Sequence, residues 1–359
     1  MTQREKEVFD IIREQPMITH EQIAAKLGIS ASTVSVHVAS LLQQGALAGK
    51  GYVINEDYVV CLGVAIMDIF GFAGTDMIAD DKNPGSEVHL ACGGAARNIA
   101  ENLARLGVNV KYISVVGDDA FGRELTETCR AAGMDVNGVT VMPGARTATY
   151  MCVLDAEGNQ IVGLTDSAIE HLQTVEFYRG FDRVLSGAKA IVMTGEPSDG
   201  VVRYLHQRYP NTPIYADTAS GSDAARFREK LPCYELLKMN IHEARMLSGK
   251  QTAEEAAADI LAAGTKQVVI TLGTQGAYYA NAAGESCRCD AIRPAQVANP
   301  NGAGDAFAAG FIRCALKGCS PAESLRYGAA AAAIALESDQ SVNRALTLAE
   351  TEKRIAAAE

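Results

Sequence analysis

The residues best suited to chemistry form a glycine-rich run that ends in an acid, Asn299-Pro-Asn-Gly-Ala-Gly-Asp305. An apolar pattern at helical spacing follows it, so we expect the backbone amides of Gly302, Ala303 and Gly304 at the positive end of a helix dipole. Such amides stabilise a transferring phosphoryl group, and the Asp305 carboxylate beside them can take the proton from an attacking hydroxyl. The alternative is an aspartate that caps a helix after a tight loop.

Two further patterns have groups that can bind a ligand. Cys92-Gly-Gly-Ala-Ala-Arg-Asn98 opens a helical stretch and combines glycine backbone with an amide that both donates and accepts hydrogen bonds. Asp68 follows a buried strand-like run, at the edge where α/β sheets bind ligands, although a surface turn also uses aspartate. The run from Gly45 to Gly51 is the nearest approach to a phosphate-binding loop of the G-x-x-x-x-G-K-[ST] type, and its spacing is wrong.

Composition is that of a globular protein with one large core or two domains. The chain has 359 residues, of which 48% are hydrophobic and 21% are charged. Its first residues lack the apolar stretch of a signal peptide, and no run of about 18 apolar residues occurs, so we expect a cytoplasmic protein with no membrane contact. Nine scattered cysteines predict reduced thiols. The net charge of −11 argues against a chain-wide surface for nucleic acid.

Residues 1–56 have the pattern of a separate small domain. Helical stretches follow one another closely, with caps at Thr19 and Ser30 and a turn at Gly28, and a strand-like piece at 51–55 ends the segment. This order is typical of a helix-turn-helix. In its third helix we expect the apolar residues Val34, Val38, Leu41 and Leu42 to point inward and the polar residues Ser32, Thr33, Ser35 and His37 to point outward.

Residues 57–359 alternate short β-rich runs with longer helical ones, which predicts an α/β domain with a mainly parallel sheet and helices on both faces. We expect strands at 59–62, 110–116, 190–193, 214–216 and 268–271, and helices at 95–106, 120–132 and 252–263. An antiparallel hairpin at 149–163 breaks this alternation. We interpret it as part of a small β lid formed by the segments at about 70–90 and 147–165.

Four motifs occur in the order and at the separations found in the PfkB/ribokinase family of carbohydrate and nucleoside kinases. They are Gly93-Gly94 through Asn98, Asn240-Ile-His-Glu243, Thr271-Leu-Gly-Thr-Gln-Gly276 and Gly302-Ala-Gly-Asp305. Residues 57–340 resemble this family. The resemblance implies a ribokinase-like fold and a phosphotransferase that uses ATP and Mg²⁺ to phosphorylate an alcohol group.

The resemblance also implies residue roles. Asp305 would be the catalytic base, with the amides of Gly302, Ala303 and Gly304 as the anion hole. Contacts with the substrate would come from Asp68, Gly93, Gly94, Arg97, Asn98, Thr149 and Asp166. Contacts with the nucleotide would come from Asn240, Thr271, Gly273 and Gly276, with Glu243 and Asn240 organising Mg²⁺ through water. A capped helix is the alternative interpretation of Asn240 and Glu243. Many members have an aspartate six residues before the base, where it helps to bind K⁺. Asn299 takes that place here and counts against a K⁺ requirement.

Within the family the resemblance is greatest to the pseudouridine kinases, through the run from Gly93 to Gly107, through Thr147-Ala-Thr-Tyr150 and through Asp166. It implies that the acceptor is the 5′-hydroxyl of a nucleoside, most simply pseudouridine. Another nucleoside or a free sugar is the alternative.

Residues 1–56 resemble the winged helix-turn-helix domains of bacterial regulators, which implies DNA binding. The segment has five basic and six acidic residues, a net charge of −1. Because phosphate contacts supply much of the affinity for DNA, we expect a homodimer that reads two half-sites. A non-DNA role for this domain also remains open. A second hypothesis for the whole chain is a transcriptional regulator that uses the kinase fold as a ligand sensor. The complete set of kinase motifs favours catalysis, since a sensor needs no base.

Overall fold

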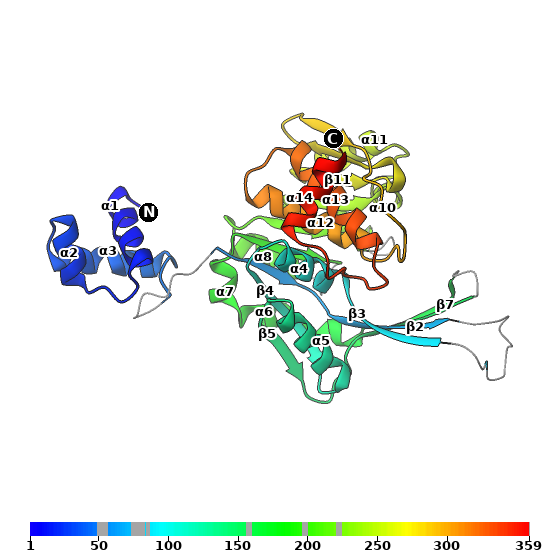
Figure 1. The fold of residues 1–359 in the computed structure, drawn as a ribbon, viewed down its shortest axis with the longest axis horizontal. Helices are drawn as coiled ribbons and strands as arrows, with labels where there is room; N and C mark the ends of the chain where they lie inside the picture. Colours follow the sequence, from blue (N-terminus) through cyan, green and yellow to red (C-terminus); the bar gives the residue numbers. More distant parts are fainter. Residues whose placement is uncertain are drawn as a thin grey trace. The chain divides into compact units, whose positions relative to one another are not determined.

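The computed structural model describes residues 1–48, 57–72, 83, 87–155, 160–195, 200–219 and 225–358 (Figure 1). Their contacts divide the chain into two compact units, Met1–Asp57 and Tyr58–Glu359. The division falls one residue from the boundary expected from the sequence.

The N-terminal unit is built from three helices, α1 (Gln3–Glu14), α2 (His20–Leu27) and α3 (Ala31–Gln43). Thr19 and Ser30 cap α2 and α3 as predicted, and Gly28 ends α2 in the left-handed region at φ 64°. Val34, Val38 and Leu41 are buried, but Leu42 is 39% exposed, so its predicted burial is wrong. The helix repeat of 3.6 residues turns Leu42 past the buried stripe. The predicted strand at 51–55 lies outside the described residues.

Glu5 connects α1 to α3. Its carboxylate completes a capping box with Thr2 and accepts hydrogen bonds from Ser40 Oγ at 2.6 Å and Gln44 Nε2 at 3.2 Å. These hydrogen bonds, that of Ser40 first, lower the pKa of Glu5 to about 2. The carboxylate therefore stays ionised, and the contact between the two helices is retained, until the solution is strongly acidic.

The C-terminal unit contains a large, mainly parallel sheet. Within the described residues its order is β13-β12-β11-β10-β9-β8-β1-β4-β5, and β12 is antiparallel to both of its neighbours, β11 and β13. Its strands are β1 (Val59–Leu62), β4 (Val110–Gly117), β5 (Asp135–Met142), β8 (Ala190–Thr194), β9 (Ile214–Asp217), β10 (Leu236–Asn240), β11 (Gln267–Thr271), β12 (Ala277–Asn281) and β13 (Ser286–Cys289).

Helices pack on both faces of this sheet. The described helices of this unit are α4 (Ala95–Arg105), α5 (Ala120–Ala131), α6 (Val175–Arg179), α7 (Asp182–Ser186), α8 (Val201–Arg208), α10 (Ile241–Ser248), α11 (Ala253–Ala262), α12 (Ala303–Leu316), α13 (Pro321–Leu336) and α14 (Leu348–Ala358), with short 3₁₀ segments at Ala168–Leu172, Ala225–Cys233 and Gly273–Gln275. The last helix, α14, packs on α13.

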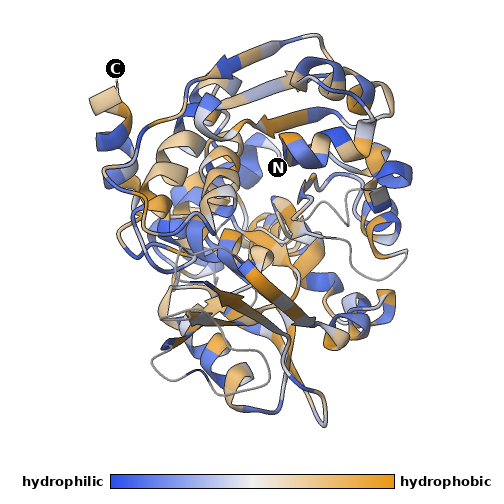
Figure 2. Cartoon of the chain, turned by 90° about the vertical axis from the view of Figure 1, so that its right-hand side faces the viewer, coloured by the Kyte–Doolittle hydropathy of each residue, from blue (hydrophilic) through white to orange (hydrophobic). Residues whose placement is uncertain are grey.

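Alternate residues of the central strands point into two separate hydrophobic cores, one on each face of the sheet. Val59 and Cys61 of β1 pack with α4, α12 and α13, whereas Val60 and Leu62 pack with α8, α10 and α11. Figure 2 shows the resulting hydrophobic colouring of the inner strands. Because both faces of these strands are buried, the strands appear in the sequence as continuous apolar runs. Every strand and helix that the sequence predicted in this unit is confirmed.

A second, smaller sheet extends from the large one (Figure 1). Its order is β3-β2-β6-β7, with strands β2 (Ile66–Phe72), β3 (Glu87–Gly93), β6 (Thr149–Leu154) and β7 (Gln160–Asp166). The hairpin of β6 and β7 is the predicted one, while residues 73–82 and 84–86 of the other predicted lid segment lie outside the described residues. Hereafter this sheet is called the lid.

Among the described residues no single helix is long and apolar enough to cross a membrane. The pair α2 and α3 passes that test jointly on length and composition, but a bend of 108° separates the two helices.

Candidate active site

Asp305 lies in the first turn of α12, and its carboxylate does not cap the helix. The N-cap is Gly302, at φ 81°, and no side chain forms a cap hydrogen bond there. A Cβ on Gly302 would lie 1.9 Å from the Ser341 carbonyl oxygen, so this loop needs glycine. The amides of Ala303 and Gly304 begin the helix and have no intrahelical acceptor. The capping alternative therefore does not apply to Asp305, and the helix start has the form of an anion site.

Asn98 connects Asp305 to α4. Its Nδ2 donates to Asp305 Oδ2 at 2.7 Å, and Asn98 is 5% exposed. Arg97, which the sequence predicted as a substrate contact, is 1% exposed and donates to protein groups, among them Glu101 and the Gly93 carbonyl oxygen. The structure thus places Arg97 behind the wall of the site. This corrects the expectation of direct contact, because the helix turns adjacent residues to different sides.

Asp68 lies within the lid strand β2, not beyond the end of a buried strand as the sequence suggested. Its carboxylate packs on the backbone of Gly93, where a Cβ would lie 2.0 Å from Asp68 Oδ2. Gly94 follows at φ 90° and starts α4. The two glycines therefore allow Asp68 to approach the start of the helix that carries Asn98.

The carboxyls of Asp305 and Asp68 both have raised pKa values. Burial, reinforced by the Asp217 carboxylate, raises the pKa of Asp305 to about 7, against opposing contributions from Asn98, Lys238 and Arg97. Burial raises the pKa of Asp68 to about 6, and Arg97 opposes that shift. A carboxyl with a pKa near neutrality is well matched to accepting a proton from a hydroxyl.

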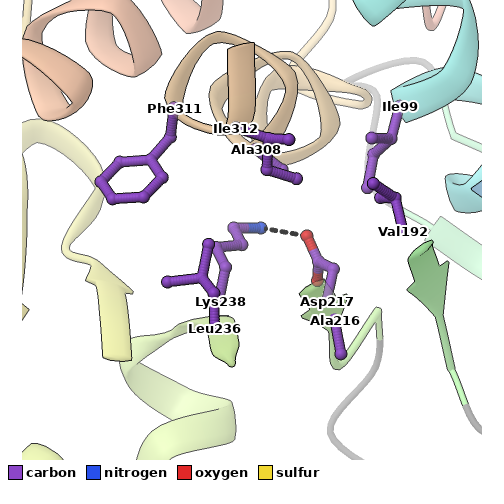
Figure 3. Close-up of a pocket in the computed structure, with 9 residues that line it drawn as sticks. All are labelled: Ile99, Val192, Ala216, Asp217, Leu236, Lys238, Ala308, Phe311 and Ile312. Carbon is purple, nitrogen blue, oxygen red and sulfur yellow. Dashed lines mark hydrogen bonds and ion pairs between the residues drawn. The ribbon is translucent and has the colours of Figure 1, made fainter. Parts of the chain in front are cut away.

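A buried ion pair lies beneath α12, and the sequence reading missed it. Lys238 Nζ on β10 donates to Asp217 Oδ2 on β9 at 2.7 Å, and both side chains are buried. Figure 3 shows this pair facing a cavity of about 10 Å³ that is closed by the apolar side chains Ala308, Phe311 and Ile312 of α12. A lysine inside the otherwise apolar strand Leu236–Asn240 was the available signal.

Lys238 acts electrostatically on the site. A Cβ built on Gly304 would lie 3.0 Å from Lys238 Nζ, so the ammonium group sits close to the start of α12. Burial alone lowers the pKa of Lys238, but the carboxylates of Asp217, Asp305 and Glu243 raise it overall. The lysine remains charged and places a fixed positive charge among these three acids.

The Asn240 and Glu243 pair forms a capping box at the start of α10. Asn240 Oδ1 accepts from the Glu243 amide at 2.9 Å, and Glu243 Oε2 accepts from the Asn240 amide at 2.8 Å and from Thr218 Oγ1 at 2.7 Å. The capped helix that was the alternative reading of this motif is present. Among the described residues no cluster of three or more His, Cys, Asp or Glu side chains can hold a metal ion. The carboxylate and amide oxygens of Glu243 and Asn240 are hard donors of the kind that Mg²⁺ prefers, so the pair fits Mg²⁺ that keeps several of its waters.

Thr271 lies beside Asn240, since the two residues are register partners at the carboxyl ends of β11 and β10. Gly273 and Gly276 follow in a tight loop with φ values of 62° and 84°. The carboxyl ends of parallel strands, where this loop lies, are where open α/β sheets bind ligands. The predicted nucleotide contacts are thus brought to one edge of the sheet.

A cleft of about 760 Å³ lies between the lid and the start of α12. Asp305, Asn98, Gly302 and Asp68 line it, together with Asn299 and its neighbours. On the lid side the lining includes the side chains of Phe70, Phe72, His89, Tyr150, Cys152 and Gln160. Tyr150 Oη donates to Gln160 Oε1 at 3.0 Å, and the rings of Phe72 and His89 pack edge to face at 5.3 Å. The sequence predicted the lid but none of these side chains.

Thr149 and Asp166, predicted as substrate contacts, do not line this cleft. They are register partners on β6 and β7, and strand alternation puts them on the opposite face of the lid from Tyr150. Asp166 instead accepts from Arg146 Nη2 at 2.8 Å. The expectation of direct contact is corrected here. A shift of one residue in a strand decides which face a side chain occupies.

Asn299 is held inside its own loop. Its Nδ2 donates to the Asp339 carbonyl oxygen at 3.0 Å, and its Oδ1 accepts from the Asn301 amide at 2.9 Å. The amide side chain thus fixes the turn that leads to Gly302, and an aspartate could not make the first of these hydrogen bonds.

In the N-terminal unit, the residues predicted to contact DNA lie on α3. Ser32, Thr33 and Ser35 are exposed and His37 is partly exposed. The Ser35 hydroxyl donates to the Ala31 carbonyl oxygen at 3.0 Å and also contacts His20 Nδ1 at 2.9 Å. Together these side chains form a polar face at the surface of this unit.

Two family patterns match the chain. Residues 56–347 match the pfkB family of carbohydrate kinases, and residues 1–47 match winged helix-turn-helix DNA-binding domains. The chain therefore belongs to the PfkB family, with an N-terminal winged helix-turn-helix domain. It has the ribokinase-like fold and is a phosphotransferase with an alcohol group as acceptor, a sugar or nucleoside kinase.

Relatives and solved structures agree with this assignment. The chain is 30% identical to an uncharacterised sugar kinase of Escherichia coli, YeiI, over 97% of both chains. It is 31% identical to the pseudouridine kinase of Escherichia coli over 82% of this chain and 95% of that protein. It superposes with a TM-score of 0.73 on an Escherichia coli structure described as a candidate ribokinase II with ATP and Mg²⁺, at 22% identity, covering 84% of this chain and 100% of that one.

Proposed function

We propose that this kinase transfers the γ-phosphoryl group of ATP to the 5′-hydroxyl of a nucleoside, with pseudouridine as the first candidate and Asp305 as the base. The observation that carries the proposal is the cleft itself. It has a carboxylate and helix amides on one side and aromatic and amide side chains of the lid on the other.

In the proposed reaction the substrate hydroxyl oxygen attacks the γ-phosphorus and its proton passes to the Asp305 carboxylate. The bond from the γ-phosphorus to the β,γ-bridging oxygen breaks, and ADP leaves. The amides of Ala303 and Gly304 donate to the phosphoryl oxygens, where charge is concentrated. Asp68 and Asn98 accept and donate hydrogen bonds to the sugar hydroxyls and so hold the acceptor near the base.

The nucleotide would lie along Thr271, Gly273 and Gly276, at the edge of the sheet that also presents Asn240. Mg²⁺ would be held through water near Glu243 and Asn240, and it would neutralise charge on the phosphates. K⁺ is not part of the proposal, because Asn299 is an amide that is already bonded within its loop.

The lid side of the cleft supports a nucleoside over a free sugar. Phe70 and His89 are directly opposite each other on β2 and β3, and Tyr150 is opposite Asp68 on β6. These rings provide flat apolar surface for a base, and the hydrogen-bonded Tyr150 and Gln160 provide donors and acceptors for its edge. The 31% identity with a pseudouridine kinase makes that nucleoside the first to test.

The deciding experiment is a substrate panel with ATP and Mg²⁺, comparing pseudouridine, uridine, inosine, ribose and fructose by ADP release and by the mass of the product. We expect the nucleosides, and pseudouridine among them first, to have the highest kcat/KM. A higher kcat/KM for ribose or fructose would overturn the nucleoside assignment. No turnover of any of these substrates would favour a sensor that lost catalysis.

A second proposed function is DNA binding by the N-terminal unit, which rests on its match to winged helix-turn-helix domains and on the polar face of α3. With a net charge of −1 over residues 1–56, we expect binding as a homodimer to a palindromic site.

Fluorescence anisotropy of the full chain on selected DNA fragments, across a salt series, tests this proposal. We expect sequence-specific binding that weakens steeply with salt and that Thr33→Glu abolishes. Equal binding to all fragments, or a Thr33→Glu variant that binds like the unaltered chain, would contradict it. Repeating the titration with pseudouridine present would show whether the kinase substrate controls DNA binding.

A further inference from the structure

Arg97 is an unusual residue to find at 1% exposure next to a phosphoryl-transfer site. Every nitrogen of its guanidinium group donates a hydrogen bond to a protein oxygen. Nε donates to the Gly93 carbonyl oxygen at 3.0 Å, and Nη1 donates to Glu101 Oε2 at 2.5 Å. Nη2 donates to the Cys92 carbonyl oxygen at 2.5 Å and to Asn98 Oδ1. One side chain therefore joins the end of lid strand β3 to the helix α4 that carries Asn98.

The contact with Asn98 determines which way the Asn98 amide points. Because Oδ1 accepts from Arg97, the other end of the amide, Nδ2, faces Asp305 Oδ2 at 2.7 Å. With the guanidinium removed, Asn98 Oδ1 would lose this donor, and the amide would be held less firmly in the orientation that donates to Asp305. The orientation of Asn98, and with it the hydrogen bond to Asp305, depends on Arg97.

Glu101 in turn holds Arg97. It lies one helical turn further along α4, is 3% exposed, and also accepts from Arg105 Nη2 at 2.6 Å. Burying a guanidinium and a carboxylate is costly, and well-packed apolar residues are often at least as stable. A buried pair that ends on the amide next to the base is better explained by positioning than by stability.

We propose that Arg97, held by Glu101, is a positioning residue for phosphoryl transfer. It fixes the Asn98 amide so that its N–H group donates to Asp305 and keeps that carboxylate aimed at the acceptor hydroxyl. The catalytic part of this inference rests on the proposed role of Asp305 as base. The geometric part does not, because it concerns only the orientation of Asn98 and the environment of Asp305.

If Arg97 positions Asn98 in this way, its removal should change the pKa of Asp305. Among the described residues, Asn98 and Arg97 on α4, Asp217 on β9 and Lys238 on β10 act on the charge of this carboxyl. The hydrogen bond from Asn98 and the charge of Arg97 both lower the pKa of Asp305. Losing them would raise that pKa, so the carboxylate would accept a proton at a higher pH than in the unaltered protein.

The test compares Glu101→Gln with the double variant Arg97→Met/Glu101→Leu, which removes both charges together and so leaves no unpaired buried ion. The matched control is Arg105→Met, which also removes a hydrogen bond to Glu101 but leaves Arg97 and Asn98 in contact. Folding is checked by circular dichroism and thermal melting. The titration of Asp305 is followed by carbon-13 NMR of labelled aspartate carboxyls, assigned with Asp305→Asn, and needs no turnover.

We expect the Asp305 titration to move to higher pH in the double variant, less so in Glu101→Gln, and not in Arg105→Met. With an active substrate, kcat should fall by about 10- to 100-fold in the double variant while the KM for ATP is unchanged. A folded double variant whose Asp305 titration is unchanged overturns the proposal. If the double variant does not fold, an unmoved titration in Glu101→Gln overturns it instead. Absence of turnover with an altered titration would contradict the proposed kinase substrate and leave the positioning role supported.

Discussion

The two sides of the cleft between α12 and the lid differ in the kinds of side chain that line them. The side formed by α4, α12 and the large sheet, called the body here, has buried or partly buried charged and polar side chains. Hydrogen bonds join them from Glu101 through Arg97 and Asn98 to Asp305, and Lys238 and Asp217 lie beneath. Apart from the buried Cys152, the aromatic and polar side chains on the lid side are half-buried or exposed, with Tyr150 and Gln160 joined by a hydrogen bond. This difference supports the proposal that the body holds the reacting groups, where small displacements are costly, and that the lid selects the substrate.

The largest effect should come from removing the base. We expect Asp305→Asn to lower kcat by about 10² to 10⁴-fold with little change in KM, because the amide keeps the shape but cannot accept the proton. Steady-state kinetics with the best substrate of the panel measures this. A variant with kcat close to that of the unaltered protein would show that another group removes the proton.

The same substitution has a pH signature. Since the pKa of Asp305 is about 7 in the folded protein, against 3.8 for a free aspartate, the folded state binds more protons between these values. The stability that protonated Asp305 contributes to the folded state is therefore fully present below pH 4 and is lost as the pH rises through 7. We expect the Asp305→Asn variant to melt at a higher temperature than the unaltered protein at pH 8. We also expect the kcat/KM of the unaltered protein to fall as the pH drops below 7. Equal melting temperatures at pH 8 would contradict the raised pKa.

The second test concerns the buried pair beneath α12. Lys238→Met leaves Asp217 buried without its partner, and we expect a loss of about 3 to 5 kcal/mol in the free energy of unfolding. Lys111→Met is the control, because its pair with Asp135 is about one-third exposed and should cost no more than about 1 kcal/mol. Denaturant melts of both variants measure the difference. Similar losses for the two would remove the distinction between buried and surface charge on which the comparison rests.

The third test acts where lid and body meet. Gly93→Ala places a Cβ in the position of the Asp68 carboxylate, so Asp68 must move away from the start of α4. We expect kcat/KM to fall by about 10²-fold. Gly71→Ala, on the same sheet, is the control, since its Cβ would meet Val153 at an ordinary 3.8 Å. A Gly93→Ala variant with the activity of the control would show that Asp68 does not need this approach.

The smallest effect is expected on the lid. Gln160→Ala should raise KM for the nucleoside by about tenfold, the equivalent of one hydrogen bond, with kcat nearly unchanged and KM for ribose unaffected. Leu164→Ala, on the same strand, is the control because Leu164 is opposite Met151 and both side chains face away from the cleft. A fall in kcat with unchanged KM would assign Gln160 to the chemistry and break the comparison between the two sides.

The sequence left the same choice open at two helix starts, and the reason is physical. The glycine run before Asp305 and the pair Asn240 and Glu243 both had a capping alternative. It is excluded for Asp305, whose carboxylate turns to Asn98, and it is present for Asn240 and Glu243. Whether an acid at a helix start caps its own helix or bonds to another one depends on what packs against it. Local sequence contains no such information.

The sequence by itself determined the strands and helices around the site, the lid hairpin, the helix caps at Thr19 and Ser30, and Asp305 as the candidate base. These features depend on periodicity, turn chemistry and motif spacing, which are local. Only the tertiary structure decided that Arg97 is buried behind Asn98, that Thr149 and Asp166 face away from the cleft, and that Lys238 pairs with Asp217. Those outcomes depend on strand register and on contacts between residues far apart in the chain, where one residue of shift reverses the result.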